Sequence, residues 1–353
     1  MTVRHMSQQE HCHNTSGEAH IRRRWLRWLR SLMIAVGCPA CAMTSASSGR
    51  GVESEDVEQL VSATSDTCAA GKPYCYNAPV HLSAPINTPY FEGKPALSAD
   101  GLELYFVSAR PRALGGDGDQ DIYVSRRATV GGDWGEPERV PPPVSSPFFD
   151  ITPTISLDGL ALYFASNRPG PFSSPFPDLF VSRRASVNDP WGEAVNLGPG
   201  VNTPAFEGSI SISPDDRQMY YAGNFGPPDF VFHLFKSTRS TTDEPFGPGM
   251  MLGPPINSTG QWFGPQLVPN QNVMFFTAGA DNPFSPGHLL NIYVSERQGD
   301  GETWGDPIYL DTINCPTCDS ELPGIRADGK EICWIGDRGD SYGDADIYCA
   351  TRD

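Results

Sequence analysis

Short runs of alternating apolar residues recur at a nearly constant interval along most of this chain. Each run follows a polar turn of the type Ser-x-Asp-Gly, of which residues 98–101 form the first copy. The third positions of successive turns lie 58, 57, 55 and 58 residues apart. The runs after these turns occupy residues 104–106, 162–164, 219–221, 274–276 and 332–334. Self-similarity at a fixed interval predicts a repeat architecture, in which one supersecondary unit is copied five times.

Each copy predicts four short β-strands. One strand precedes the polar turn, a second follows it, a third opens with a polar residue, as in residues 121–124, and a fourth follows an aromatic–glycine pair such as Trp134 and Gly135. The chain has 36 Gly and 34 Pro among 353 residues, which favours strands joined by turns over long helices. Four-stranded units repeated radially form a β-propeller, which leaves few exposed sheet edges.

The number of blades follows from the two ends of the repeat region. The fifth copy ends after its third strand, residues 346–351, while residues 78–83 match the fourth strand of other copies, such as residues 194–197. We therefore predict an all-β fold, a five-bladed β-propeller closed by an N-terminal strand that completes the last blade. A sixth blade needs another unit of this length, and residues 42–77 contain none.

The repeat resembles the WD40-like propeller repeat of the TolB type. That repeat reads Pro-x-x-Ser-x-Asp-Gly, then an apolar strand ending in Ser-x-Arg, then Asp-Ile-Tyr, and residues 95–101, 108–110 and 121–123 match it. The resemblance covers residues 78–353 and weakens in the third and fourth copies, which depart at the Asp-Gly turn and at Ser-x-Arg. It implies a periplasmic or cell-surface binding scaffold and does not imply a reaction.

The start of the chain differs in charge from the remainder. Residues 1–37 contain six arginines and two glutamates, whereas the whole chain has a net charge of −17. Residues 22–27, Arg-Arg-Arg-Trp-Leu-Arg, resemble a twin-arginine export motif, and a short apolar run then leads to Cys38 as in a lipobox. Cys41 is a second candidate for lipidation, and an ordinary cleaved signal is the alternative.

These observations divide the chain into three parts. We predict an export signal over residues 1–37, a disordered tether over 38–74 and the propeller over 75–353. The acidic body argues against a nucleic-acid partner, because binding phosphates requires a basic surface. We expect a protein of the periplasm or of the outer membrane and cell surface that touches the membrane only through a lipid on Cys38.

A ring of acidic residues is the leading candidate for a ligand site. Inner strands of a propeller line its central channel, so carboxylates at their starts are expected to ring one mouth of it, next to aromatic side chains that suit a sugar or a cation. The alternative is that each carboxylate caps nearby backbone N–H groups. The candidate residues are Glu92, Asp150, Glu207, Trp262 in the fourth copy, Glu321 one position out of register, Phe91, Phe149 and Phe206.

Arginine and aspartate vary together within the chain. Copies with an Arg after the second strand also have an Asp that opens the third, and the other two copies lack both. Because the two positions are neighbours across a hairpin, we predict structural ion pairs. The alternative is that these charges face a ligand. The predicted pairs are Arg110 with Asp121, Arg168 with Asp178, and Arg338 with Asp346.

One loop alternates acidic residues in the way that calcium loops do. It carries Asp117, Asp119 and Asp121, but it lacks the Gly and Glu that an EF-hand loop requires at its sixth and twelfth positions. A solvated acidic loop is therefore the favoured interpretation and calcium the alternative. No other cofactor or metal is predicted.

Six cysteines lie beyond the lipidation candidates Cys38 and Cys41, and an even set in an exported chain predicts disulfide bonds. Cys333 and Cys349 fall on adjacent strands of the fifth unit and are expected to face one another. The remaining candidates, whose pairing the sequence leaves open, are Cys68, Cys75, Cys315 and Cys318. The Cys-x-x-Cys pair lacks the context of a thioredoxin-like redox site or of a zinc site.

Taken together, the residues favour a non-catalytic scaffold that binds a protein or another cell-envelope ligand, such as peptidoglycan, on one face. The long loops between second and third strands and those from fourth to first strands fall on the same face, where binding residues are expected. The alternatives are a glycan-binding module, or a glycosidase or lyase that cleaves polysaccharide with channel carboxylates.

Overall fold

The computed structural model describes residues 74–111, 120–170, 176–225, 231–258, 260–269, 272–279, 289–299, 301–343 and 345–353. The predicted export signal, Cys38 and all of the tether except Tyr74 lie outside these residues. Within them every regular element is a β-strand. None of their segments is a helix long and apolar enough to cross a membrane.

The strands form five antiparallel sheets of four strands each, which we call blades 1 to 5. Blade 1 contains β2 (Glu92–Leu97), β3 (Glu103–Ser108), β4 (Asp121–Arg126) and β5 (Glu138–Arg139). Blade 2 contains β6 (Asp150–Ile155), β7 (Ala161–Ser166), β8 (Asp178–Arg183) and β9 (Val195–Asn196). Blade 3 contains β10 (Glu207–Ile212), β11 (Gln218–Gly223), β12 (His233–Thr238) and β13 (Met250–Met251). Blade 4 contains β14 (Gln261–Leu267), β15 (Val273–Gly279), β16 (Asn291–Glu296) and β17 (Ile308–Tyr309). Blade 5 contains β18 (Ser320–Ile325), β19 (Glu331–Gly336), β20 (Asp346–Thr351) and β1 (Val80–His81).

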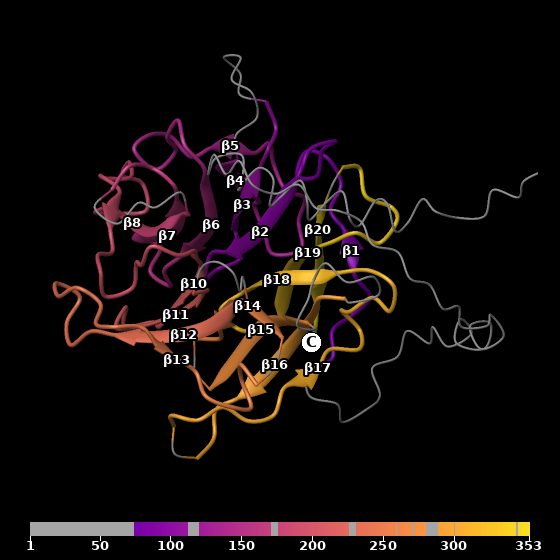
Figure 1. Cartoon of the computed structure of the whole chain (residues 1–353). Helices are drawn as coiled ribbons and strands as arrows, with labels where there is room; N and C mark the ends of the chain where they lie inside the picture. The colour runs from indigo at the N-terminus through magenta and orange to yellow at the C-terminus, as the bar shows by residue number, and fades with distance from the viewer. Residues whose placement is uncertain are drawn as a thin grey trace, which may run out of the picture.

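The blades close into a ring around a common centre (Figure 1). The first strand of each blade contacts the first strands of both neighbours, in the order β2, β6, β10, β14, β18 and back to β2. The predicted five-bladed β-propeller is therefore confirmed.

Blade 5 is completed by the N-terminal strand, as the repeat predicts. β1 pairs antiparallel with β20, with Val80 opposite Cys349 and His81 opposite Tyr348. The side chain of Asn87 extends this pairing, because its amide accepts a hydrogen bond from Ile347 N at 2.8 Å and donates to Ile347 O at 2.9 Å. The two ends of the propeller are thus joined through one sheet.

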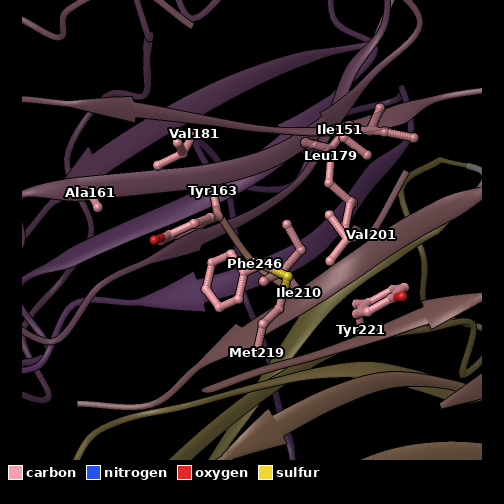
Figure 2. Close-up of a cluster of buried hydrophobic side chains, with 12 residues drawn as sticks. Ile151, Ala161, Tyr163, Leu179, Val181, Val201, Ile210, Met219, Tyr221 and Phe246 are labelled. Carbon is pink, nitrogen blue, oxygen red and sulfur yellow. The ribbon is translucent and has the colours of Figure 1, made fainter. Parts of the chain in front are cut away.

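The hydrophobic core lies between blades, because apolar faces of adjacent sheets pack together. Figure 2 shows one such layer, in which Tyr163 and Leu179 of blade 2 pack with Ile210, Met219 and Tyr221 of blade 3. All five side chains are at most 3% exposed. Alternating apolar positions in the repeat are the residues that fill these layers.

Every inner strand contains a β-bulge with one residue at positive φ. The ladder with the second strand shifts register at this point in all five blades. A bulge bends its strand and redirects nearby side chains, and it is a recurrent device beside functional sites. The bulge residues are Lys94 (φ 42°), Thr152 (51°), Ser209 (53°), Gly264 (62°) and Leu322 (53°).

Two disulfide bonds join described residues. Cys333 of β19 bonds Cys349 of β20, as predicted from their adjacent strands, with Cα atoms 4.0 Å apart. Cys315 bonds Cys318 within the loop before β18. Cys75 is also disulfide-bonded, and the candidate Cys68 lies outside the described residues.

Candidate functional site

Each blade places an aromatic pair next to the start of its inner strand. One ring comes from the second strand and its register partner comes from the third, so the two stack across the ladder. The ring centroids lie 6.2 Å apart for Phe106 and Tyr123, 6.0 Å for Phe164 and Phe180, and 5.5 Å for Tyr221 and Phe235. Blades 4 and 5 have the equivalent pairs Phe276 with Tyr293 and Trp334 with Tyr348.

In three blades an arginine covers this aromatic pair. The Cζ atom of Arg168 lies 5.1 Å from the Phe164 ring and 5.2 Å from the Phe180 ring. Its guanidinium donates to Asp150 Oδ1 at 2.5 Å and to the carbonyl of Pro143 at 3.0 Å. The guanidinium therefore ties the inner strand to the loop that enters the blade. Cation–π contact and charge-assisted bonds favour this arrangement.

Arg110 and Arg338 repeat this arrangement. Arg110 lies over Phe106 and Tyr123, donates to the carbonyl of Ile86 at 2.7 Å and lies 3.4 Å from Glu92 Oε1. Arg338 covers the aromatic pair of blade 5 and donates to the carbonyl of Ile313.

The structure corrects the partners that the sequence predicted for these arginines. Arg168 is paired with Asp150 instead of Asp178, and Arg110 with Glu92 instead of Asp121. The physical reason is that each guanidinium lies over the aromatic pair, where the inner-strand carboxyl group and the carbonyls of the entering loop are within reach.

The aspartates that open the third strands have other neighbours. Asp121 Oδ1 lies 2.7 Å from Arg139 Nη2 of β5. Asp346 Oδ2 lies 2.8 Å from His81 Nε2 of β1, so its partner is His81 and not the predicted Arg338. Asp178 accepts a hydrogen bond from Asn196 of β9 at 2.8 Å. In each case a partner comes from the fourth strand of the blade, and not from the end of the second strand as predicted.

The predicted ring of carboxylates is present but buried. Glu92, Asp150 and Glu207 are at most 2% exposed, at the first position of their inner strands. Glu92 accepts from the backbone N and hydroxyl of Thr88 at 2.8 and 2.7 Å, and Glu207 accepts from those of Thr203 at 3.1 and 2.5 Å. These are the capping contacts that the sequence left open as the alternative.

Burial also changes the acidity of these groups. Burial raises the pKa of Glu92 and of Asp150, although their hydrogen bonds and arginines oppose the change. In Glu207 burial raises the pKa to about 8, Thr203 opposes the change, and the nearby Asp178 adds to it. Glu207 is the one of these three carboxyl groups whose blade has no covering arginine.

The other predicted site residues fill the same layer. Trp262 is 5% exposed and packs on Phe276 with centroids 5.4 Å apart, in the place of the carboxylate of other blades. Glu321 is 6% exposed, one position after Ser320, as its sequence offset indicates. Phe91 and Phe149 are partly buried and Phe206 is 3% exposed.

Four large aromatic side chains remain exposed on the face that carries these loops, which we call the loop face. Tyr90 and Phe148 are 44% and 38% exposed in the loops that enter blades 1 and 2. Phe225 and Tyr342 are 69% and 54% exposed in loops between second and third strands. None of the four is among the predicted site residues, and the loop that carries Tyr342 differs between the copies.

An unusual cation lies deeper in the ring. Lys94, the bulge residue of blade 1, is 1% exposed, and its Nζ donates to the carbonyl of Pro323 in blade 5 at 3.1 Å. Burial lowers the pKa of this ammonium to about 7. Lys94 was not among the predicted site residues, since nothing in the sequence distinguishes a bulge residue.

The predicted calcium loop is only partly within the described residues. Asp117 and Asp119 lie outside them, while Asp121 is 1% exposed and lies beside Arg139. Among the residues that the structure describes, no group of three or more His, Cys, Asp or Glu side chains is arranged to hold a metal ion. Calcium binding at this loop stays a prediction.

Comparison with known proteins places the chain by its fold. No family model and no curated protein sequence matches it. The catalytic domain of a GH62 α-L-arabinofuranosidase from Coprinopsis cinerea is 9% identical with a TM-score of 0.52, and the match covers 79% of this chain and 98% of that one. A TolB from Agrobacterium tumefaciens is 15% identical with a TM-score of 0.43, covering 75% of this chain and 92% of that one. At these identities the likeness concerns the fold. The chain is a five-bladed β-propeller whose repeat resembles that of TolB.

Proposed function

We propose that this chain is exported, is anchored through a lipid on Cys38, and binds an envelope protein on the loop face of its propeller. The observation that carries the proposal is the set of four exposed aromatic side chains on that face. Aromatic residues are enriched at protein interfaces because they bury a large area with little loss of side-chain freedom. The five inter-blade cores hold the loops that carry them in fixed positions.

The contacts of the inner-strand carboxyl groups favour binding over polysaccharide cleavage. Glu92 and Asp150 each accept hydrogen bonds from a backbone N–H and a hydroxyl, and each has an arginine beside it. A glycosidase instead needs two carboxyl groups that can reach a sugar and exchange protons with it. Glycan or peptidoglycan binding to the exposed aromatics is the second outcome that the experiment below distinguishes.

Removing the exposed aromatics is expected to abolish capture of the partner. The triple variant Tyr90→Ser, Phe148→Ser and Tyr342→Ser removes aromatic area from three blades without touching the cores. Pull-down from envelope extract, read by mass spectrometry, should recover a protein with the parent propeller and lose it with the variant.

A control variant in the outer strands, Val195→Ser with Met250→Ser, alters exposed apolar residues elsewhere and should retain the partner. Recovery of the same protein by the triple variant would contradict the proposal. Retention of the parent on peptidoglycan or polysaccharide, without recovery of a protein, would favour the glycan alternative.

The anchor has its own test. Changing Cys38 to Ser should move the protein from the membrane fraction to the soluble fraction, because a serine cannot take the lipid. Cys41→Ser is the matched control and should leave fractionation unchanged. Membrane association of the Cys38 variant that is lost only when Cys41 is also changed would assign the lipid to Cys41.

A further inference from the structure

We propose that the junction between blades 2 and 3 binds the guanidinium group of an arginine side chain that a partner polypeptide supplies. The proposal rests on the proposed function, since it assumes a protein partner on the loop face. It adds where that partner is held and by which chemical group.

The junction between blades 1 and 2 shows how the chain fills such a position with its own residues. Two buried carboxyl groups meet there, Asp121 from the third strand of blade 1 and Asp150 from the first strand of blade 2. Each has its own guanidinium: Arg139 lies 2.7 Å from Asp121, and Arg168 lies 2.5 Å from Asp150. The two buried acids are thus matched by two cations.

The junction between blades 5 and 1 follows the same scheme. Asp346 and Glu92 are both 0% exposed. Asp346 has the imidazole of His81 at 2.8 Å, and Glu92 has the guanidinium of Arg110 at 3.4 Å. Each carboxyl group again has a nitrogen base or cation as its partner.

At the junction between blades 2 and 3 both nitrogen partners are replaced. The carboxyl groups are retained, as Asp178 and Glu207, but Asn196 occupies the position of Arg139 and Phe225 occupies the position of Arg168. Asp178 is 0% exposed, and its Oδ1 has no hydrogen-bond donor among the residues that the structure describes. Two buried acids therefore meet here without a cation from the described part of the chain.

In blade 2 the aromatic pair, the entering loop and the inner-strand carboxyl group together hold Arg168, and we call this set the arginine cradle. Blade 3 has counterparts of all three. Tyr221 and Phe235 stack with centroids 5.5 Å apart and planes 18° apart, as the rings under Arg168 do. Val201 takes the place of Val144, whose carbonyl accepts from Arg168, and is buried to a similar degree. Glu207 is held by Thr203 as Glu92 is held by Thr88.

Two substitutions in blade 3 remove donors that the carboxyl group has in the other blades. Gly223 replaces the serine that donates to Glu92 in blade 1, so Glu207 lacks that hydroxyl donor. Phe225 is 69% exposed, and its ring forms a T-shaped contact with Phe235, with centroids 6.0 Å apart. The residue that replaces the arginine therefore supplies neither its charge nor its hydrogen-bond donors.

A guanidinium fits this cradle better than a metal ion or a compact ammonium. It is planar and stacks on aromatic faces, and its donors reach two acceptors at once. The chain itself uses a guanidinium over the same rings in blades 1, 2 and 5. Burial raises the pKa of both Asp178 and Glu207, which is the effect that an added cation would reverse.

The test uses the whole propeller and two short peptide amides, Gly-Arg-Gly and its neutral isostere Gly-citrulline-Gly. Isothermal titration should show saturable binding of the arginine peptide and at least tenfold weaker binding of the citrulline peptide. Glu207→Gln should weaken the arginine peptide at least tenfold, because it removes the charge but keeps an acceptor for Thr203. Equal binding of both peptides, or no change in Glu207→Gln, would overturn the proposal, as would binding of calcium but not of the arginine peptide.

A second variant tests the site by refilling it. Phe225→Arg restores an arginine at the position that Arg168 has in blade 2, and it should raise the Tm while abolishing peptide binding. Pro111→Arg is the matched control, since it adds the same charge at an exposed loop position of blade 1, and it should retain binding. If Phe225→Arg binds the peptide as the parent does, the cradle is not the site. Capture of an envelope protein that depends on the exposed aromatics but not on Glu207 would leave the proposed function standing without this inference.

Discussion

A chain that begins at Ala84 is expected to lose most of the stability of the closed ring. This truncation removes β1, so Val80 and His81 no longer pair with Cys349 and Tyr348. It also removes the His81 partner of Asp346, a carboxyl group that is 0% exposed. Leaving a buried charge without its partner costs about 3–5 kcal/mol of folding stability. The edge of β20 that β1 covers is freed, so we expect aggregation as well as a Tm lower by at least about 10 °C.

Two longer chains separate the effect of β1 from that of the segment before it. A chain that begins at Tyr74, with Cys75→Ser, should melt close to the parent. A chain that begins at Ala78 also loses Tyr76, which is 1% exposed and donates to the carbonyl of Gly329 at 2.9 Å. Loss of such an aromatic costs about 3–5 kcal/mol. If the chains beginning at Ala78 and Ala84 melted at the same temperature, β1 would not be the strand that closes the ring.

Replacing Lys94 with Met is expected to stabilise the propeller at pH 6 and to remove a pH dependence above it. Met has a similar length and no charge, so the variant avoids burying an ammonium whose only acceptor among the described residues is the Pro323 carbonyl. The bulge geometry is unchanged, because Met meets the same φ of 42° as Lys. Removal of a buried charge without a carboxylate partner is expected to be favourable.

The sign of the pH dependence follows from proton binding. The pKa of Lys94 is about 7 in the folded chain against an ordinary value of 10.5. Between these values the unfolded chain binds the proton and the folded chain does not, so the stability of the parent rises as the pH increases through this window. Below pH 7 both states are protonated, and the full cost of burial is present, on the order of 5 kcal/mol.

The measurement is the difference in unfolding free energy between Lys94→Met and the parent from pH 6 to pH 10, in which the other titrating groups cancel. The advantage of Met should be largest at pH 6 and should shrink as the pH rises. The exposed Lys330 provides the control, since Lys330→Met should show no such trend. A difference that does not change with pH would mean that Lys94 keeps its proton in the folded ring.

The partners of the buried carboxyl groups could not be predicted from the sequence. The joint variation of Arg168 with Asp178 was visible in the repeat, but the partner of Arg168 is Asp150. Joint variation reports that two positions depend on a common environment, and here that environment is the aromatic pair and the entering loop. The absence of an arginine beside Glu207 could be read from the sequence only once this partner was known.

The sequence by itself determined the repeat, the number of blades, the strand that closes the ring and the bond between Cys333 and Cys349. These features depend on the alternation of apolar and polar residues and on the spacing of the turns, and both patterns recur in each copy of the repeat. Tertiary structure alone decided that the predicted ring of carboxylates is buried and capped, that each inner strand bulges, and that Lys94 is enclosed. The reason is that burial and charge balance at a junction depend on residues of two blades, often 20 or more positions apart, such as Asp178 and Glu207.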